Sequence, residues 1–258
     1  EDVSVLFSTL NTSGTSTYSW TSNIEIGAGL SATGDMNFTA TNLSTAPVVA
    51  TITVTPTFEN GDVVCDGEDK TFTITVNPTA QVDQPVSQVV CNGEDVSVLF
   101  STLNTSGTST YSWTSDIEIG AGLSGTGDMN FIAINSSTAP VEATITVTPT
   151  FEFDDVVCNG EDKTFTITVN PTAQVDDLTN QVVCNGDTTS IVEFTTQNTG
   201  GTTTYTWTNN TSSIGLSDSG TGDILAFTAT NSSTAPVVAT ITVTPTFENG
   251  GIDCGGED

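Results

Sequence analysis

The chain has 258 residues, of which 31 are acidic and two are basic, so its formal net charge is -29, and it contains no histidine. Phosphate binding draws its affinity from Lys and Arg, so this composition argues against nucleic acid as a partner and against insertion into an anionic membrane. Hydrophobic residues make up 35% of the chain. They alternate with polar residues, a pattern that argues against a disordered segment.

The sequence contains the same unit three times. Residues 1–79 align without a gap on residues 94–172 with nine differences, and a third unit carries Trp207 where the earlier ones have Trp20 and Trp113. A period of 93 residues lies within the usual size of one domain. We therefore expect an array of domains in which each unit does the same mechanical job.

In the middle unit the expected elements are all short strands. Alternation of Thr with apolar residues and the Gly, Asn, Ser and Pro turns place strands near residues 89–91, 96–101, 109–115, 117–119, 128–134, 141–153 and 164–170. About seven such strands in about 90 residues are typical of an immunoglobulin-like β-sandwich. The sequence therefore predicts an all-β chain of tandem immunoglobulin-like domains, with Trp20, Trp113 and Trp207 in their cores.

Two further features bound each domain. Asn60-Gly61 predicts a hairpin turn near the end of the first unit, and residues 153–155 and 249–251 occupy the same place in the others. Linkers with Pro and acidic residues follow, near residues 77–85 and 171–177. We expect domains at 1–79, 80–172 and 173–258, called here the first, second and third repeats. By this division the first repeat lacks its first strand and the third lacks its last, which indicates either a window from a longer array or strands borrowed from neighbouring chains; we prefer the window.

Several motifs carry a resemblance to a known family. They are Gln88–Gly93, Tyr111–Trp113, Gly125–Asp128, and the stretch from Ala50–Thr57 to Thr71–Thr79. Together they closely resemble the PKD-like repeats of giant surface proteins in Bacteroidota, of which gliding-motility adhesins are the best known. The resemblance implies PKD-like β-sandwiches in a surface-anchored protein exported by the type IX secretion system. It supplies no catalytic residue.

The cysteines recur twice per repeat, at positions 65, 91, 158, 184 and 254, which agrees with an extracellular location. Three pairings fit: Cys91 with Cys158 inside one domain, Cys65 with Cys91 across a linker, or Cys91 with the hairpin cysteine of the next domain, Cys254. Bridged cysteines need α-carbons within about 7 Å, and a nine-residue strand spans roughly 30 Å. The turn between the first two strands faces the next domain, so the geometry favours Cys91 with Cys254; the other pairings stay open.

Carboxylates gather around the same cysteines. If the turn and hairpin of adjacent domains meet, Ca²⁺ would find oxygen ligands at the junction from Glu94, Asp95, Asp253, Glu257 and Asp258. A solvated acidic surface is the competing interpretation, and we expect no other cofactor. Separately, Asp187-Thr188-Thr189 resembles the O-glycosylation signal of Bacteroidota, which makes Thr188 a candidate acceptor.

These features predict a structural protein. An enzyme is not expected, because there is no His or Arg, and near-identical repeats would need one active site three times over. We expect a stalk or filament shaft of a cell-surface adhesin for attachment or gliding. Its partners would be further repeats, neighbouring chains of a fibre, and a surface or polysaccharide reached through other regions of the protein. Two alternatives remain: a multivalent carbohydrate- or surface-binding module, and a self-assembling extracellular filament subunit with strand exchange between chains.

Overall fold

Alternation of threonine with apolar residues produces strands that have one buried face. In β13 (Val141–Phe153), Ala143 and Ile145 are fully buried, whereas Glu142 and Thr144 face solvent. The structure, a computed structural model, describes residues 1–256. Apart from the three-residue 3-10 turn η1 (Ser212–Ile214), every regular element within that range is a strand.

The first repeat forms two sheets that face each other. Its strands are β1 (Asp2–Val5), β2 (Thr15–Ser22), β3 (Ser31–Thr33), β4 (Met36–Thr39), β5 (Val48–Asn60), β6 (Val63–Asp66) and β7 (Lys70–Val76). One sheet has the order β3-β2-β5-β6, with β7 also on β5, and the other is the pair β1-β4, all antiparallel. Trp20, Met36 and Ile52 from these sheets meet in one core. This is the predicted all-β, immunoglobulin-like sandwich, and the prediction of fold class is confirmed.

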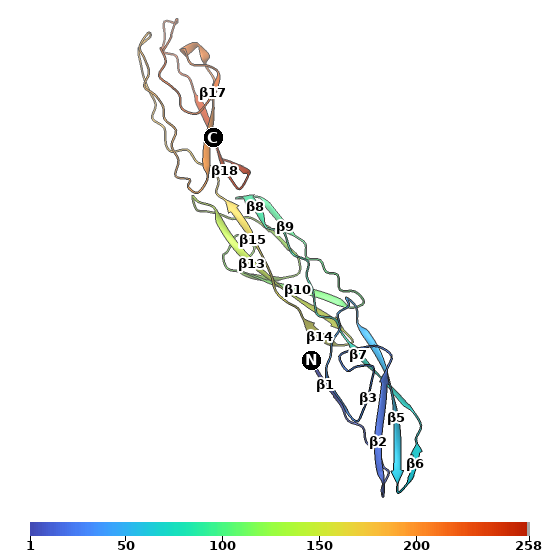
Figure 1. The fold of residues 1–258 in the computed structure, drawn as a ribbon. Coiled ribbons are helices and arrows are strands. Elements are labelled where there is room, and N and C mark those ends of the chain that lie inside the picture. The colour runs from blue at the N-terminus through green and yellow to red at the C-terminus, as the bar shows by residue number, and fades with distance from the viewer. Residues whose placement is uncertain (257–258) are drawn as a thin grey trace. The chain divides into compact units, whose positions relative to one another are not determined.

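The second repeat has the same elements and one more strand at its start. They are β8 (Gln88–Cys91), β9 (Asp95–Val98), β10 (Thr108–Ser115), β11 (Ser124–Thr126), β12 (Met129–Ile132), β13, β14 (Val156–Asn159) and β15 (Lys163–Asn170). β8 lies parallel to β15, with Gln88 opposite Ile167 and Cys91 opposite Asn170 (Figure 1). β9 pairs antiparallel with β12.

The third repeat has fewer regular strands. These are β16 (Thr202–Asn209), β17 (Ser219–Thr221), β18 (Ile241–Asn249) and β19 (Ile252–Gly255), ordered β17-β16-β18-β19. Its core joins Phe194, Trp207, Leu216, Ile224 and Val243. Residues 181–184 and 237–240 lie outside any strand, although their counterparts in the second repeat belong to β8 and β13.

The chain divides into two compact units, and their boundary runs through the second repeat. One unit contains Glu1–Asp83, Phe100–Ser112 and Val147–Lys163; the other contains Gln84–Leu99, Trp113–Thr146 and the chain from Thr164 onwards. The domain boundaries near Thr79 and Thr172 therefore stay a prediction. No helix among residues 1–256 has the length and apolar character needed to cross a membrane.

One expected strand is wrong. Residues 117–119 form a turn instead of a strand, although Ile119 is fully buried. The carboxylate of Glu118 accepts the N–H groups of Gly120 and Gly122 at 2.7 and 3.0 Å. Gly120 adopts a φ of 106°, which favours glycine. These hydrogen bonds curl the backbone, so the apolar residues on either side of Glu118 do not belong to a ladder.

Candidate functional site: the joint between repeats

A hairpin of each later repeat contacts the end of the repeat before it, through an asparagine at the end of the last strand. In the first compact unit, called the first unit from here on, the amide nitrogen Nδ2 of Asn77 donates to the carbonyls of Phe153 and Val156, at 3.1 and 3.4 Å. These two carbonyls lie on either side of the hairpin turn. In the second unit, Asn170 stands in the place of Asn77 and donates to the carbonyl of Asn249 at 3.0 Å. The same contact is therefore built twice.

A second asparagine ties each linker to both of its neighbours. Nδ2 of Asn104 donates to the carbonyls of Thr45 and Thr79, and its Oδ1 accepts the N–H of Gln81 at 2.7 Å. Asn198 repeats this pattern. Its Nδ2 donates to the carbonyls of Thr138 and Thr172, and its Oδ1 accepts the N–H of Gln174 at 2.7 Å. Each linker is thus hydrogen-bonded along its length and is not a free tether.

Backbone contacts next to the asparagines reinforce the joint. The N–H of Thr105 donates to the carbonyl of Thr45, and the N–H of Thr199 donates to the carbonyl of Thr138, both at 2.8 Å. Each linker also forms an isolated parallel bridge with its hairpin, between Ala80 and Gly160 in the first unit and between Ala173 and Gly256 in the second.

Glycine is required at this bridge. A Cβ on Gly160 would overlap the carbonyl oxygen of Ala80, and a Cβ on Gly256 would overlap that of Ala173. The hairpin can therefore approach the linker closely only because these residues have no side chain.

The joint of the second unit is closed by a covalent bond. Cys91, at the end of β8, forms a disulfide with Cys254 in β19, with α-carbons 5.5 Å apart and a sequence separation of 163. Cys254 is buried. The hairpin tip lies against β8, since a Cβ on Gly250 would stand 3.1 Å from Cγ2 of Val89. The disulfide thus connects the first strand of one repeat to the hairpin of the next.

The remaining cysteines are free thiols. Cys65 and Cys184 are exposed and Cys158 is partly exposed. Neither the pairing of Cys91 with Cys158 nor that of Cys65 with Cys91 is formed.

The residues expected to bind calcium are only partly brought together. Glu94 Oε2 accepts the N–H of Cys91 at 2.9 Å, so this carboxylate holds the turn after β8. Asp95 begins β9, Asp253 lies in β19, and Glu257 and Asp258 lie outside the described residues. Within residues 1–256, no three His, Cys, Asp or Glu side chains gather as a metal site. Calcium binding stays a prediction.

The other residues singled out by the sequence have simple surroundings. Trp20, Trp113 and Trp207 are buried in the cores of their repeats. Thr188 is exposed and forms an isolated antiparallel bridge with Thr228, and its glycosylation stays a prediction. Sequence reasoning overlooked the asparagines of the joints. The available signal was their recurrence: Asn77 and Asn170 stand one period apart, and Asn104 and Asn198 precede a threonine at matching places.

Comparisons with known proteins give structural likenesses alone. No protein-family model matches the chain, and no curated protein sequence matches it. Among solved structures, the FN1–FN3 domains of chicken CNTN1 are 9% identical over 94% of this chain and 89% of that chain, with a TM-score of 0.31. The ectodomain of human desmocollin-1 is 11% identical over 86% of this chain and 45% of that chain, with a TM-score of 0.24.

Proposed function

We propose that this chain is part of the shaft of an extracellular adhesin, in which β-sandwich repeats in series carry load and hold a distal binding region away from the cell. The observation that carries the proposal is the recurrence of one joint. Asn77 and Asn104 build it in the first unit, and Asn170 and Asn198 build it in the second. A chain in which the same hydrogen bonds connect consecutive repeats at equivalent places is suited to a mechanical role.

The disulfide gives the joint a covalent route for load. Force that enters at Cys91 passes directly to Cys254 and bypasses the stretch between them, since the two cysteines are separated by 163 positions in sequence. A cross-link across a loop of this size also stabilises the folded state, typically by about 2–5 kcal/mol, mainly by restricting the unfolded chain. The repeat body therefore stays folded while the bridge bears tension.

The proposed location is the cell surface. A structural disulfide persists in an oxidising compartment, which agrees with an extracellular position. The resemblance of Gln88–Gly93 and Tyr111–Trp113 to PKD-like repeats of Bacteroidota supports a surface protein exported by the type IX system and used in gliding or attachment. A net charge of -29 favours solubility and keeps parallel shafts apart at low ionic strength.

The alternative of a multivalent binding module has less support. Aromatic side chains that bind sugars need exposed rings, whereas Trp20, Trp113 and Trp207 are buried in the cores. The joints, in contrast, are built from asparagine side chains that bind backbone carbonyls, not from aromatic rings.

Negative-stain electron microscopy of the purified chain tests the shaft proposal. We expect single beaded threads, and a chain with Asn104→Ala and Asn198→Ala should give threads with a broader distribution of angles between beads. The matched control is Asn11→Ala and Asn210→Ala, which leaves the joint asparagines in place. Identical angle distributions in all three proteins, or threads without separate beads, would overturn the proposal.

A further inference from the structure

Asn249, which pairs with Asn170 in the joint, is followed by a glycine and can lose its side-chain amide without an enzyme. In an Asn-Gly pair the backbone nitrogen of the glycine attacks Cγ of the asparagine. A carbon–nitrogen bond forms, ammonia leaves with the hydrogen atom of the glycine N–H, and the product is a succinimide ring. Glycine favours this step because it has no side chain that obstructs the approach. Water then opens the ring at either carbonyl, which gives aspartate or isoaspartate.

The bonding of the glycine nitrogen separates the Asn-Gly pairs of this chain. The pairs begin at residues 60, 92, 159, 185 and 249. In three of them the glycine N–H donates to a backbone carbonyl, at 2.8, 3.0 and 2.8 Å: Gly93 to Ala133, Gly160 to Pro149 and Gly186 to Ala229. A nitrogen held in this way must break its hydrogen bond before it can attack, so the fold itself protects these asparagines.

Gly250 and Gly61, in the hairpin turns of the third and first repeats, have no such restraint. Neither N–H donates to an acceptor within residues 1–256. The turn therefore leaves the attacking nitrogen of Gly250 available, and only a restraint on the side chain of Asn249 can prevent ring closure.

The joint restrains Asn249 through two hydrogen bonds. Its Nδ2 donates to Oδ1 of Asn170 at 2.9 Å, and its backbone carbonyl accepts Nδ2 of the same residue at 3.0 Å. Asn170 is fully buried. The following glycine is also packed, since a Cβ on Gly250 would stand 3.1 Å from Cγ2 of Val89 in β8. Rotation of Cγ of Asn249 towards the nitrogen of Gly250 would therefore break the amide pair.

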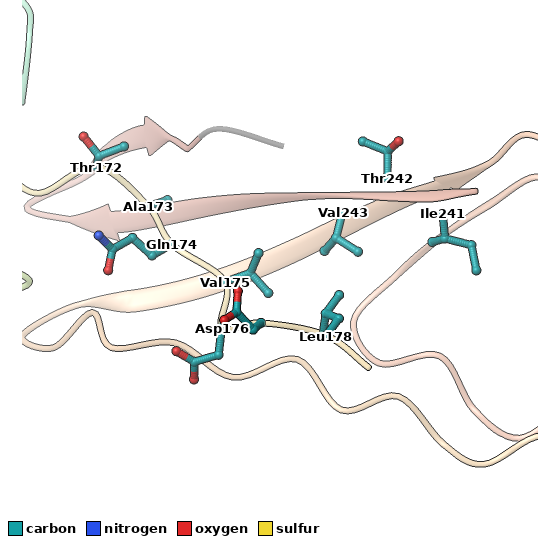
Figure 2. Close-up of a pocket in the computed structure, with 10 residues that line it drawn as sticks. Thr172, Ala173, Gln174, Val175, Asp176, Leu178, Ile241, Thr242 and Val243 are labelled. Atoms are coloured by element: carbon teal, nitrogen blue, oxygen red, sulfur yellow. The ribbon is translucent and has the colours of Figure 1, made fainter. Parts of the chain in front are cut away.

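The linker helps to keep the hairpin of β18 and β19 in this position. Gly256, which follows β19, forms a bridge with Ala173 of the linker. Figure 2 shows Val175, farther along the linker, beside β18, where it packs against the core that contains Val243. Asn249 is the last residue of β18. The amide pair therefore persists as long as the hairpin stays docked.

Asn60 provides an unrestrained comparison within the same chain. It is exposed, its side chain forms no hydrogen bond within residues 1–256, and a Cβ on Gly61 would meet no atom within 4 Å. A glutamate, Glu59 or Glu248, precedes each of the two asparagines, so their intrinsic rates of amide loss should be close. A difference between their rates in the folded chain then measures the effect of the joint.

We propose that Asn249 is a spontaneous modification site that the joint controls. While the hairpin is docked, Asn249 keeps its amide; when the hairpin leaves the repeat before it, Asn249 is converted to aspartate or isoaspartate. Neither product restores the contact, because a carboxylate does not donate to Oδ1 of Asn170, and isoaspartate also lengthens the backbone opposite Ile252. Opening of the joint thus becomes irreversible. The inference concerns the chemistry of the joint and does not require the joint to carry load.

Incubation of the full chain in mildly alkaline buffer, followed by peptide mass spectrometry, tests this proposal. We expect Asn249 to lose its amide at least about fivefold more slowly than Asn60, because a hydrogen bond must break first. In the reduced chain unfolded in urea, the two residues should convert at similar rates. Equal rates in the folded chain, or a difference that persists in the unfolded chain, would overturn the proposal.

Two variants assign the protection to the joint. Asn170→Ala should raise the rate at Asn249 about fivefold or more, because both hydrogen bonds of the pair are lost. The matched variant Asn77→Ala removes the equivalent asparagine of the first unit and should leave the rate at Asn249 unchanged. The rate at Asn185 should stay low in both proteins. No rise at Asn249 in Asn170→Ala would overturn the proposal, and so would an equal rise at Asn185, because it would assign the effect to unfolding of the third repeat.

Discussion

Asn170 and Asn249 form a reciprocal amide pair across the joint of the second unit. Nδ2 of Asn170 donates to the carbonyl of Asn249 at 3.0 Å, and Nδ2 of Asn249 donates to Oδ1 of Asn170 at 2.9 Å. In the first unit Phe153 occupies the place of Asn249 and has no side-chain donor. Consequently Oδ1 of Asn77 is buried without a hydrogen-bond partner among the described residues.

This difference predicts opposite effects of two exchanges. Phe153→Asn should stabilise the first unit by about 1 kcal/mol, because it supplies the missing donor, and Asn249→Phe should destabilise the second by about 1–3 kcal/mol, because it leaves Oδ1 of Asn170 unpaired. Urea unfolding of the two variants and the parent chain measures both values. A loss of stability in Phe153→Asn would show that the phenylalanine contributes more at that joint than the hydrogen bond.

The close approach of linker and hairpin predicts a sharp contrast between neighbouring glycines. Gly256→Ala should cost about 1–3 kcal/mol, because its Cβ would overlap the carbonyl oxygen of Ala173 and force the backbone apart. Gly255→Ala is the control, since a Cβ there meets no atom within 4 Å. Its effect on the free energy of unfolding should stay within about 0.5 kcal/mol. Equal effects at the two positions would rule out the contact.

The hairpin turn of the second repeat carries local strain that a glycine relieves. Asp154 and Asp155 have φ values of 53° and 60°, whereas Gly250 and Gly251 occupy the same turn of the third repeat. Asp155→Gly creates the Asp-Gly pair that such two-residue turns prefer and should raise the free energy of unfolding by about 1 kcal/mol. Gly251→Asp should lower it by a similar amount. Thermal unfolding of both variants measures these effects. A shift of both unfolding midpoints in the same direction would show that glycine does not relieve strain in this turn.

Hydrogen bonds at the entry to the third repeat predict a loss of stability in acid. Oγ1 of Thr195 and Nε2 of Gln197 donate to the carboxylate of Asp176 at 2.6 and 3.0 Å, and they lower the pKa of Asp176 below its ordinary value of 3.8. A lowered pKa means that the carboxylate stabilises the fold above pH 3.8 and that this contribution disappears as the pH falls through the lowered value. The difference in free energy of unfolding between the parent chain and Asp176→Asn should therefore be largest near pH 6 and shrink as the pH falls below 3.8. A difference that stays constant with pH would contradict it.

Much of the fold could be predicted because, in a strand buried on one face, apolar residues recur at every second position. The expected strand at residues 141–153 has the bounds of β13, and that at 164–170 differs from β15 by one residue. The error at residues 117–119 arises because Ile117 and Ile119 have the same spacing as residues of a strand. Only the hydrogen bonds of Glu118 to the glycines that follow it separate the two conformations.

The joint was harder to predict, because its contacts include pairs of residues that are 76, 79 or 163 positions apart. The favoured pairing of Cys91 with Cys254 came from the expected topology of the sandwich, and the structure forms that bond. Asn104 and Asn198 precede a threonine at matching places, but the local sequence does not show which backbone groups their amides bind.

The central claim is that load passes from one repeat to the next through Cys91 and Cys254. Single-molecule pulling of the chain from its two ends, with and without a reducing agent, tests this claim most directly. With the disulfide intact, the residues between the two cysteines should not extend; after reduction, or in Cys91→Ser, the fully stretched chain should gain about 550 Å, which is 163 residues at roughly 3.4 Å each. The same stretched length under both conditions would contradict the account.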